Sequence, residues 1–361
     1  MESVVHEKYD DVTTIKDFTS FICPPDYLIK QSQKSIKQSL IASSVVRDYS
    51  DYTKGVNHVR WNPQYGHLLA SCSMDSFCHI HSVFPDHGSI MTIKHEDIIK
   101  DIRWNFDGSK LLTGSKDKTV KYIDVQTGKT ICSYPHKDSI SSVCFHPSNP
   151  SFFLAGGETK GIVCWDIRLN KVIGSFYDVF GTVEDLAFTD KTGNTFISSA
   201  DILRKNSTDR GLIAWDFNKH LKISNQIYME GFNCTSLCVH PTMNIFAAQS
   251  NGNYICLAQS IPPFKLNLIK RFEGHNCSGY KIGCCWSSDG NLLLTGSSDG
   301  LLYYYNSNSA KIIYRKKLSN QVLTDVDYHP CLNGIVAVSS WDKHIYILDA
   351  KEKNEKIDDI Q

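Results

Sequence analysis

Residues 281–318 read KIGCCWSSDGNLLLTGSSDGLLYYYNSNSAKIIYRKKL, and they contain four strand-like runs separated by turn residues. It divides into an alternating run ending at Asp289-Gly290, an almost wholly apolar run ending at Asp299-Gly300, and the runs LLYYYN and IIYRKKL. Asp-Gly pairs favour tight turns between antiparallel strands. The last run mixes charged and apolar residues, which is typical of a strand at the edge of a sheet. The stretch therefore predicts a four-stranded antiparallel sheet, the unit of a β-propeller.

The same pattern recurs along the chain with a regular spacing. Each unit opens with a pair of mostly apolar or aromatic residues two positions apart: Val59/Trp61, Ile102/Trp104, Val143/Phe145, Leu186/Phe188, Leu237/Val239, Cys284/Trp286 and Val326/Tyr328. A turn residue follows the second strand of each unit, at Asp75, Asp117, Thr159, Asp201, Asn251, Asp299 and Asp342. A period of roughly 40 to 50 residues is that of a propeller blade. Two markers in phase predict an all-β, seven-bladed propeller.

Closing this ring requires a strand from outside the last unit. Residues 323–349 supply three strand-like runs, and the charged segment 351–361 follows without a fourth. The segment IASSVVRDY, residues 41–49, has strand composition and precedes the first unit. We expect it to fill the vacant edge. We also expect residues 1–33 to form an extended or disordered arm, residues 34–350 a single propeller domain and residues 351–361 a charged tail.

Composition narrows the classes of partner and the compartment. The 38 Lys and Arg residues balance 38 Asp and Glu residues, which disfavours direct binding to nucleic acid because such proteins carry a basic excess. An odd number of cysteines, 13, fits a reducing compartment better than a disulfide framework. The sequence shows neither a signal peptide nor an apolar stretch of membrane-spanning length. We expect a nuclear or cytosolic protein that does not enter the membrane.

The repeats resemble the WD40 family from about residue 42 onward. Trp-Asp pairs end the third strand at Trp165-Asp166 and Trp215-Asp216. The resemblance implies a buried network that joins a His, a Ser or Thr, a turn Asp and a third-strand Trp. Its expected members are His95, Ser115 and Asp117 in the second unit, with Ile123 in the Trp position, and His275, Ser297 and Asp299 in the sixth, with Tyr305 in that position. We expect this network to pin the turns and to have no part in catalysis.

Catalytic and metal-binding patterns are weak in this sequence. It contains no P-loop, dinucleotide fingerprint, HExxH or CxxC pair. His79 and His81 share one side of a strand, but no third ligand is clearly placed beside them. No acid, base and nucleophile come together in the repeat. We therefore expect a protein without catalytic activity, cofactor or metal.

The predicted binding surface is one face of the ring. Turns between the second and third strands share this face with the connections between units. Trp341, Met74 and Lys116 stand just before such turns, Phe180 and Phe232 lie in connections, and an insertion in the fourth unit carries Arg204, Lys205 and Arg210. Exposed aromatic and Met side chains on a rigid scaffold are typical of binding hot spots. The alternative is that each side chain packs on a neighbouring loop and that the insertion is a tolerated surface loop.

Several strings are similar to the second-step pre-mRNA splicing factors among the WD40 propellers. They include YTKGVNHVRWNP, FAAQSNGNY and the segment FKLNLIKRFEGHNCSGYKIGCCWSSDG between the fifth and sixth units. The resemblance implies a monomeric, non-catalytic scaffold that binds proteins of a nuclear ribonucleoprotein assembly. One alternative is a substrate receptor of a cullin-RING ubiquitin ligase, because Trp165-Asp166-Ile167-Arg168 resembles the WDxR signature of those receptors, with Arg168 as the informative residue. The other is a WD40 adaptor of an unrelated complex.

Overall fold

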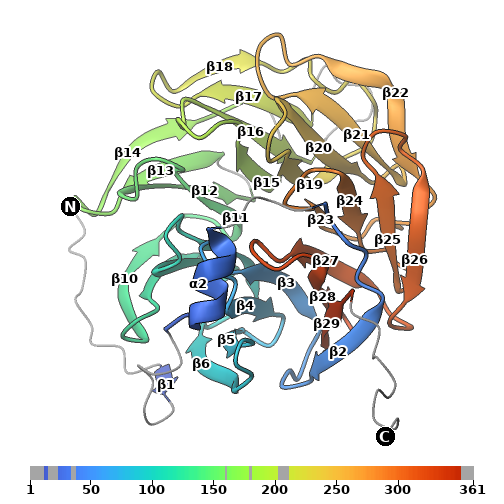
Figure 1. The fold of residues 1–361 in the computed structure, drawn as a ribbon. Helices are drawn as coiled ribbons and strands as arrows, with labels where there is room; N and C mark the ends of the chain where they lie inside the picture. Colours follow the sequence, from blue (N-terminus) through green and yellow to red (C-terminus); the bar gives the residue numbers. More distant parts are fainter. Residues whose placement is uncertain are drawn as a thin grey trace, which may run out of the picture.

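The computed structural model shows seven antiparallel sheets arranged as blades around one axis (Figure 1). It describes residues 12–14, 23–33, 38–158, 161–178, 181–201 and 211–350. The predicted seven-bladed propeller is confirmed. Each blade follows the expected order, with the first strand innermost and the fourth outermost of the four, and in blade one a further short strand pairs outside the fourth.

The strands of the blades have the following bounds. Blade one holds β3 (Val56–Trp61), β4 (Leu68–Ser73), β5 (Phe77–Ser82) and β6 (Gly88–Lys94), and blade two holds β7 (Ile99–Trp104), β8 (Lys110–Ser115), β9 (Thr119–Asp124) and β10 (Lys129–Pro135). Blade three holds β11 (Ile140–Phe145), β12 (Phe152–Gly157), β13 (Ile162–Asp166) and β14 (Lys171–Phe176), and blade four holds β15 (Val183–Phe188), β16 (Thr195–Ala200), β17 (Leu212–Asp216) and β18 (Leu221–Ser224). Blade five holds β19 (Cys234–Val239), β20 (Ile245–Ser250), β21 (Tyr254–Gln259) and β22 (Leu266–Glu273), and blade six holds β23 (Cys284–Trp286), β24 (Leu292–Thr295), β25 (Leu301–Asn306) and β26 (Ile312–Lys317). Blade seven holds β27 (Leu323–Tyr328), β28 (Ile335–Ser340), β29 (Ile345–Asp349) and β2 (Ser44–Tyr49).

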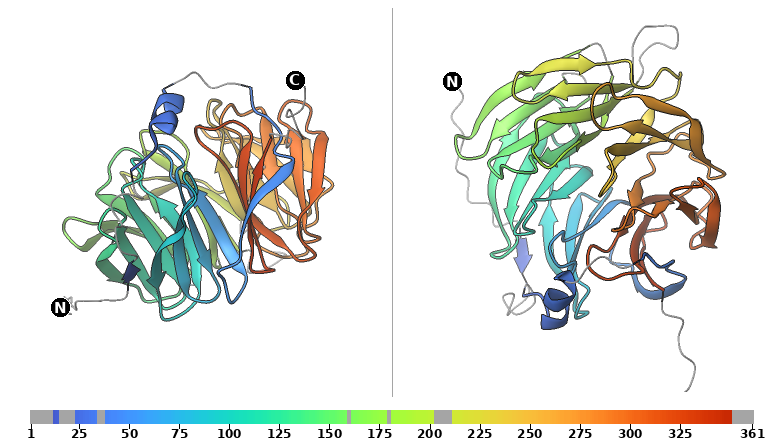
Figure 2. Two further views of the ribbon diagram at one scale, coloured as in Figure 1. Left: turned by 60° about the horizontal axis from the view of Figure 1, so that its bottom comes forward. Right: turned by 45° about the horizontal axis from the view of Figure 1, so that its top comes forward.

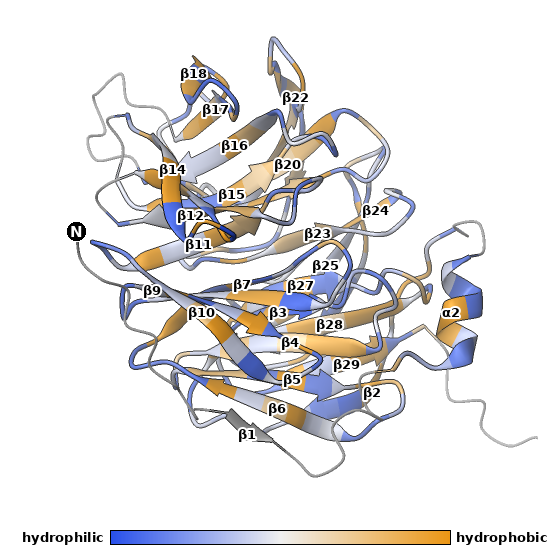
Figure 3. Cartoon of the chain, turned by 90° about the vertical axis from the view of Figure 1, so that its left-hand side faces the viewer, coloured by the Kyte–Doolittle hydropathy of each residue, from blue (hydrophilic) through white to orange (hydrophobic). Residues whose placement is uncertain are grey.

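Burial follows the position of a strand within its blade. Every residue of β4 and of β28 is buried, because neighbouring blades cover both faces of these second strands. The outermost strand β26 is mostly exposed. Figure 3 shows hydrophobic colour along β4, β20 and β28, and more hydrophilic colour in the connecting loops. The core therefore lies between the blades, and the loops are the parts of the molecule open to partners.

Blade seven is completed by β2, as predicted from residues 41–49. The strand β2 pairs antiparallel with β29, from Ser44 opposite Asp349 to Tyr49 opposite Ile345 (Figure 1). An early segment of the chain thus closes the ring against a late one. This pairing protects an edge that would otherwise expose unpaired backbone groups.

The segment just before β2 also binds the ring. The backbone N–H of Ser39 donates to Asp289 at 2.8 Å, and its hydroxyl donates to the same carboxylate at 2.5 Å. The Tyr304 hydroxyl donates to the carbonyl oxygen of Ala42 at 3.0 Å. We call residues 38–43 the strap, because they tie blade six to the closing strand of blade seven. Burial alone would raise the pKa of Asp289, but hydrogen bonds from Ser287 and Ser39 outweigh it and lower this pKa.

Residues upstream of the strap differ in part from the expected arm. Asp26–Ser32 form helix α2, so the prediction of an extended or disordered conformation is wrong for these residues. Leu28 on this helix is fully buried, and its burial supplies the tertiary contact that a short helix needs. Two views in Figure 2 place α2 against the ring. The short strand β1 (Val12–Thr14) is extended and pairs with β6 at the outside of blade one.

The predicted C-terminal tail and the expected absence of a membrane-spanning segment are the remaining expectations about the fold. Residues 351–361, the predicted tail, lie outside the described residues. Within the described ranges, no helix has the length and apolar character needed to cross a membrane.

Candidate functional site

The predicted polar network of blade two is present, with one member changed. His95 Nδ1 lies 2.7 Å from Asp117 Oδ2, and Nε2 lies 2.8 Å from the Thr113 hydroxyl. Ser115 was predicted to bind this His. Its hydroxyl instead accepts from the Asp117 backbone N–H at 3.1 Å and donates to the Asp97 carbonyl at 3.0 Å. Thr113 could have been found from the sequence, because it faces the same side of the strand two positions earlier.

Blade six holds a different network from the predicted one. His275 Nδ1 lies 2.9 Å from the Tyr305 hydroxyl, and Nε2 lies 2.7 Å from the Gln249 side chain of blade five. The Ser297 hydroxyl accepts from the backbone N–H of Asn276, in the connection from blade five, at 3.1 Å. The Asp299 carboxylate accepts from the backbone N–H of Leu301 at 3.2 Å. The predicted hydrogen bond between the Asp299 carboxylate and His275 is therefore wrong. Tyr305, in the Trp position, places its own hydroxyl beside the His275 imidazole.

The two third-strand tryptophans also differ from each other. Trp215 Nε1 donates to the Ser198 hydroxyl at 2.8 Å within the core. Trp165 Nε1 donates directly to His136 Nε2 at 3.0 Å. Blade three thus has a Trp–His pair without an intervening hydroxyl.

The innermost strands carry ion pairs that the sequence analysis missed. Asp325 is fully buried, lies 2.9 Å from His58 Nδ1 and also pairs with Arg60. Arg103 of blade two lies 3.3 Å from Asp101 and 2.8 Å from Asp185 of blade four. This last contact skips blade three. A sequence signal existed, since each of these aspartates immediately precedes the first marker residue of its unit.

Trp341 is half-buried on the loop face, where the sequence predicted an exposed hot spot. Its ring meets Tyr280 edge-on at a centroid distance of 4.9 Å. A Cβ atom on Gly55 would lie 2.9 Å from Trp341 Cδ1, so the indole packs against the backbone of blade one. The Nε1 group is buried without a hydrogen-bond partner among the described residues. Trp341 therefore joins blades six, seven and one and leaves little area for a partner.

The connection from blade four to blade five carries two exposed apolar side chains close together on this face. Phe232, predicted as a contact, is 48% exposed, and Met229, which the sequence analysis missed, is 55% exposed. Glu230 anchors the loop between them through Arg271 and the Tyr254 hydroxyl. The Phe232 ring meets that of Tyr254 edge-on at 6.5 Å. We call Met229 and Phe232 the apolar pair.

The other predicted contact residues are spread over the molecule. Met74 is half-buried and Lys116 is exposed on the loop face. Asp201 precedes the insertion of blade four and accepts a hydrogen bond from Asn233, which places the start of this insertion beside the apolar pair. Four predicted residues lie outside the described residues: Phe180, Arg204, Lys205 and Arg210.

Arg168 lies on the opposite face, in the turn between the third and fourth strands of blade three. Its side chain is 66% exposed and pairs with Asp166 at 3.3 Å. Over the described part of the chain, no three His, Cys, Asp or Glu side chains are grouped to hold a metal ion.

Comparison with known proteins matches this architecture. The model of the "WD domain, G-beta repeat" family matches residues 43–82 and 266–306, and that of the "Anaphase-promoting complex subunit 4 WD40 domain" matches residues 88–148. Mouse WD repeat-containing protein 25 is 32% identical over 314 residues, which are 86% of this chain and 58% of that protein. Mouse Pre-mRNA-processing factor 17 is 29% identical over 83% of the chain and 51% of its own length. Denticleless protein homolog B of Xenopus laevis is 25% identical over 67% and 40%, respectively.

These matches run through most of the ring. The chain spans only about half the length of the first two relatives, 58% and 51%. The matched repeats and the seven blades together make this chain a WD40-repeat β-propeller.

Proposed function

We propose that this propeller is a non-catalytic scaffold that binds other proteins within a nuclear ribonucleoprotein assembly of the pre-mRNA splicing type. The similarity to Pre-mRNA-processing factor 17 supports this role, because it covers 83% of the chain. The neutral net charge fits contacts with proteins rather than with the phosphates of RNA. Nuclear localisation is part of this proposal.

The apolar pair is the observation that carries the proposed contact surface. Met and aromatic side chains are enriched at protein interfaces, and a few such residues supply most of the binding energy. The ion pair of Glu230 with Arg271 holds their loop in place before a partner arrives. A preordered loop loses little conformational entropy on binding, so more of the contact energy remains as affinity.

The proposal predicts that Met229→Ala with Phe232→Ala weakens partner binding without unfolding the ring. The tagged full-length protein would be purified from nuclear extract, and small nuclear ribonucleoprotein proteins quantified by mass spectrometry. We expect recovery to fall at least about tenfold at an unchanged melting temperature. Leu221→Ala with Ile131→Ala is the matched control, because both side chains are exposed on outer strands. Normal recovery with the Met229 and Phe232 variant would place the contact elsewhere.

The exposed side chain of Arg168 favours a second candidate function, that of a substrate receptor of a cullin-RING ubiquitin ligase. In that case Arg168→Ala, added as a further arm of the same purification, removes a ligase adaptor that the wild type retains. A ribonucleoprotein scaffold keeps its partners in that arm, because Arg168 lies on the face opposite the apolar pair.

A further inference from the structure

The outer strand of blade five, β22, carries a bulge that exposes two large apolar side chains. Its ladder with β21 breaks at residues 267–270, which stand opposite the single residue Leu257. Such a break turns side chains away from the sheet. Leu268 is 70% exposed and Ile269 is 96% exposed. We call residues 267–270 the bulge, and its two apolar side chains offer area that a partner can cover.

The bulge is held in one conformation before any partner binds. The side-chain oxygen of Asn267 accepts from the backbone N–H of Ile269 at 3.1 Å and from that of Lys270 at 3.0 Å. The turn that leads into β22 is anchored by Phe264, which is 1% exposed and packs in the core between blades four and five. The protein therefore loses little conformational entropy when a partner binds here.

A groove of about 570 Å³ lies beside the bulge. Its lining is mostly apolar and reaches from the bulge to Leu257, to Met243 in the turn before β20 and to Asn308 in blade six. These turns join first to second and third to fourth strands, so they lie on the face opposite the apolar pair. The volume falls in the range of sites that bury most of a ligand. The groove is thus a candidate surface separate from that of the proposed function.

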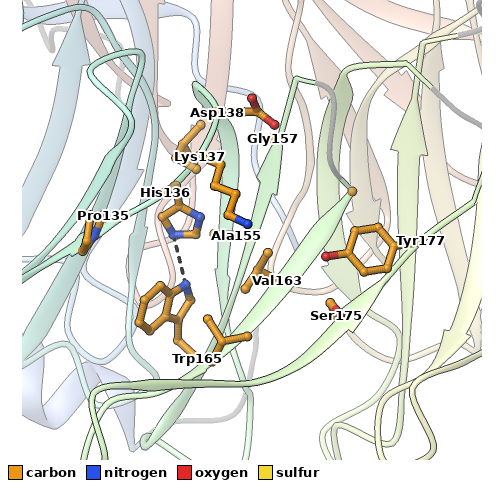
Figure 4. Close-up of a pocket in the computed structure, with 13 residues that line it drawn as sticks. Pro135, His136, Lys137, Asp138, Ala155, Gly157, Val163, Trp165, Ser175 and Tyr177 are labelled. Carbon is orange, nitrogen blue, oxygen red and sulfur yellow. Dashed lines mark hydrogen bonds between the residues drawn. The ribbon is translucent and has the colours of Figure 1, made fainter. Parts of the chain in front are cut away.

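The charged side chains that line the groove are basic. They are Lys265 and Lys270, and none of the described residues in the lining is acidic. Neither lysine forms an ion pair within the described ranges, whereas the polar side chains of Trp165 and His136 in blade three are paired with each other at 3.0 Å (Figure 4). Burial lowers the pKa of Lys270, so its amine is already partly withdrawn from water. An acidic partner can supply the missing counter-charge.

We infer that this groove binds an acidic amphipathic segment of a partner protein. The apolar side chains of the segment pack against Leu268, Ile269 and Met243. Its carboxylates pair with the amines of Lys265 and Lys270. The apolar contacts supply most of the affinity, and the charges exclude basic sequences. The inference adds a second contact surface to the proposed function and takes from it only that the occupant belongs to a protein.

The groove favours a protein segment over the surface of an anionic membrane. A planar layer of headgroups can touch the bulge, but it cannot fill the space between the turns of blades five and six. The side chains of a segment can enter that space. Vesicles are therefore one arm of the test.

The test uses purified full-length protein and three synthetic libraries of twelve-residue peptides. The first library mixes Leu, Ile, Met and Phe with Asp, Glu and Ser. The second replaces Asp and Glu by Lys and Arg, and the third contains Asp, Glu and Ser without apolar residues. We expect the protein to select peptides from the first library alone, because only those peptides match both the apolar and the basic side chains of the groove.

Removal of the apolar contact tests the bulge directly. Leu268→Ser with Ile269→Ser should reduce the affinity for each selected peptide at least about tenfold. The melting temperature should not change, because both side chains are exposed. Leu221→Ser with Ile223→Ser is the matched control on the outer strand of blade four, and this variant should keep the affinity of the wild type.

Reversal of the two charges tests the choice of partner. Lys265→Glu with Lys270→Glu should bind the acidic peptides at least about tenfold more weakly and should now select peptides from the basic library. Such a gain of binding cannot arise from unfolding. Lys129→Glu with Lys171→Glu changes two exposed lysines outside the lining and should keep the preference of the wild type.

Each other outcome overturns the inference. The groove does not read such a segment if no peptide is selected, if the libraries are selected equally, or if the Leu268 and Ile269 variant keeps its affinity. Binding of phosphatidylserine vesicles that this variant loses would assign the bulge to a membrane, and a dimer that it dissociates in sedimentation would assign the bulge to a second copy. Higher peptide affinity after deletion of residues 351–361 would make the chain's own tail the occupant. None of these results changes the nuclear-extract experiment with Met229 and Phe232, because those residues lie on the opposite face.

Discussion

Two aspartates on strand β27 have opposite charge preferences. For Asp325, burial alone would raise the pKa, but Arg60 and His58 outweigh it and lower the pKa to about 2. For Asp327, burial dominates and raises the pKa to about 6, although the Trp61 backbone N–H donates to this carboxylate at 2.7 Å. At mildly acidic pH, Asp325 is therefore an ionised carboxylate, whereas Asp327, two positions further along the same strand, is largely a protonated carboxylic acid.

Asp327→Asn should change how stability depends on pH. The folded pKa of Asp327 lies above the ordinary value of about 3.9, so its contribution to wild-type stability falls as pH rises from about 4 to about 6. The Asn variant does not titrate and so lacks this loss of stability. Its amide oxygen can still accept the hydrogen bond from the Trp61 backbone N–H. Its stability relative to wild type should rise by up to about 3 kcal/mol over that range and stay constant above it, as measured by urea unfolding.

Asp325→Asn is the matched control on the same strand. A depressed pKa stabilises the folded state fully above about pH 4, and this stabilisation is lost only as pH falls toward about 2. The Asp325 variant should therefore be less stable than wild type by a constant amount between pH 4 and pH 7. Parallel stability curves for wild type and Asp327→Asn would contradict the assignment for Asp327.

The sequence predicts which residues meet at a turn better than it predicts which atoms bond. The resemblance to the WD40 family implied the pair of His95 with Asp117, and the structure contains it. The sequence could not show that the Tyr305 hydroxyl would replace Asp299 as the partner of His275. This partner depends on how deeply the Tyr305 side chain lies in the core. Trp341 was misjudged for a related reason, since its burial depends on Gly55 in a different blade.

At the scale of elements, the strap and β2 together should be needed for a closed ring. Deleting residues 1–50 removes both and exposes the edges of β29 and the groups that bind the strap, so we expect a lower melting temperature and aggregation. Deleting residues 1–22 is the control, because it keeps α2, the strap and β2. Light scattering and differential scanning calorimetry measure both effects. A monodisperse 1–50 deletion with the melting temperature of the full chain would show that β2 does not hold the ring.

The closing strand and the helix differ in how far the sequence could predict them. The closing strand could be predicted by counting strand-like runs. The last unit has only three of them, and residues 41–49 have the composition of a fourth. Helix α2 spans seven residues, and its N-cap residue Pro25 makes no side-chain capping bond. Such a helix depends on the burial of Leu28 against the ring, which no local pattern reveals.

At the scale of the molecule, Arg103 connects blades that are not neighbours. Arg103→Met leaves the carboxylates of Asp101 and Asp185 buried without this partner, and we expect a loss of about 3–5 kcal/mol in the free energy of unfolding. Lys219→Met is the control, because its pair with Asp216 is 3.8 Å long and largely exposed. That change should cost less than about 1 kcal/mol. Denaturant unfolding with equal midpoints for the two variants would contradict a global role for Arg103.

The pairing of β2 with β29 has a mechanical consequence. Ser44 lies opposite Asp349, so the chain enters β2 and leaves β29 at the same end of the ladder. A pulling force applied between residues 43 and 350 therefore peels the two strands apart and loads their hydrogen bonds one after another. Force applied along the strands would instead load all of them together. In an assembly that moves its parts, this seam is where tension opens the ring first.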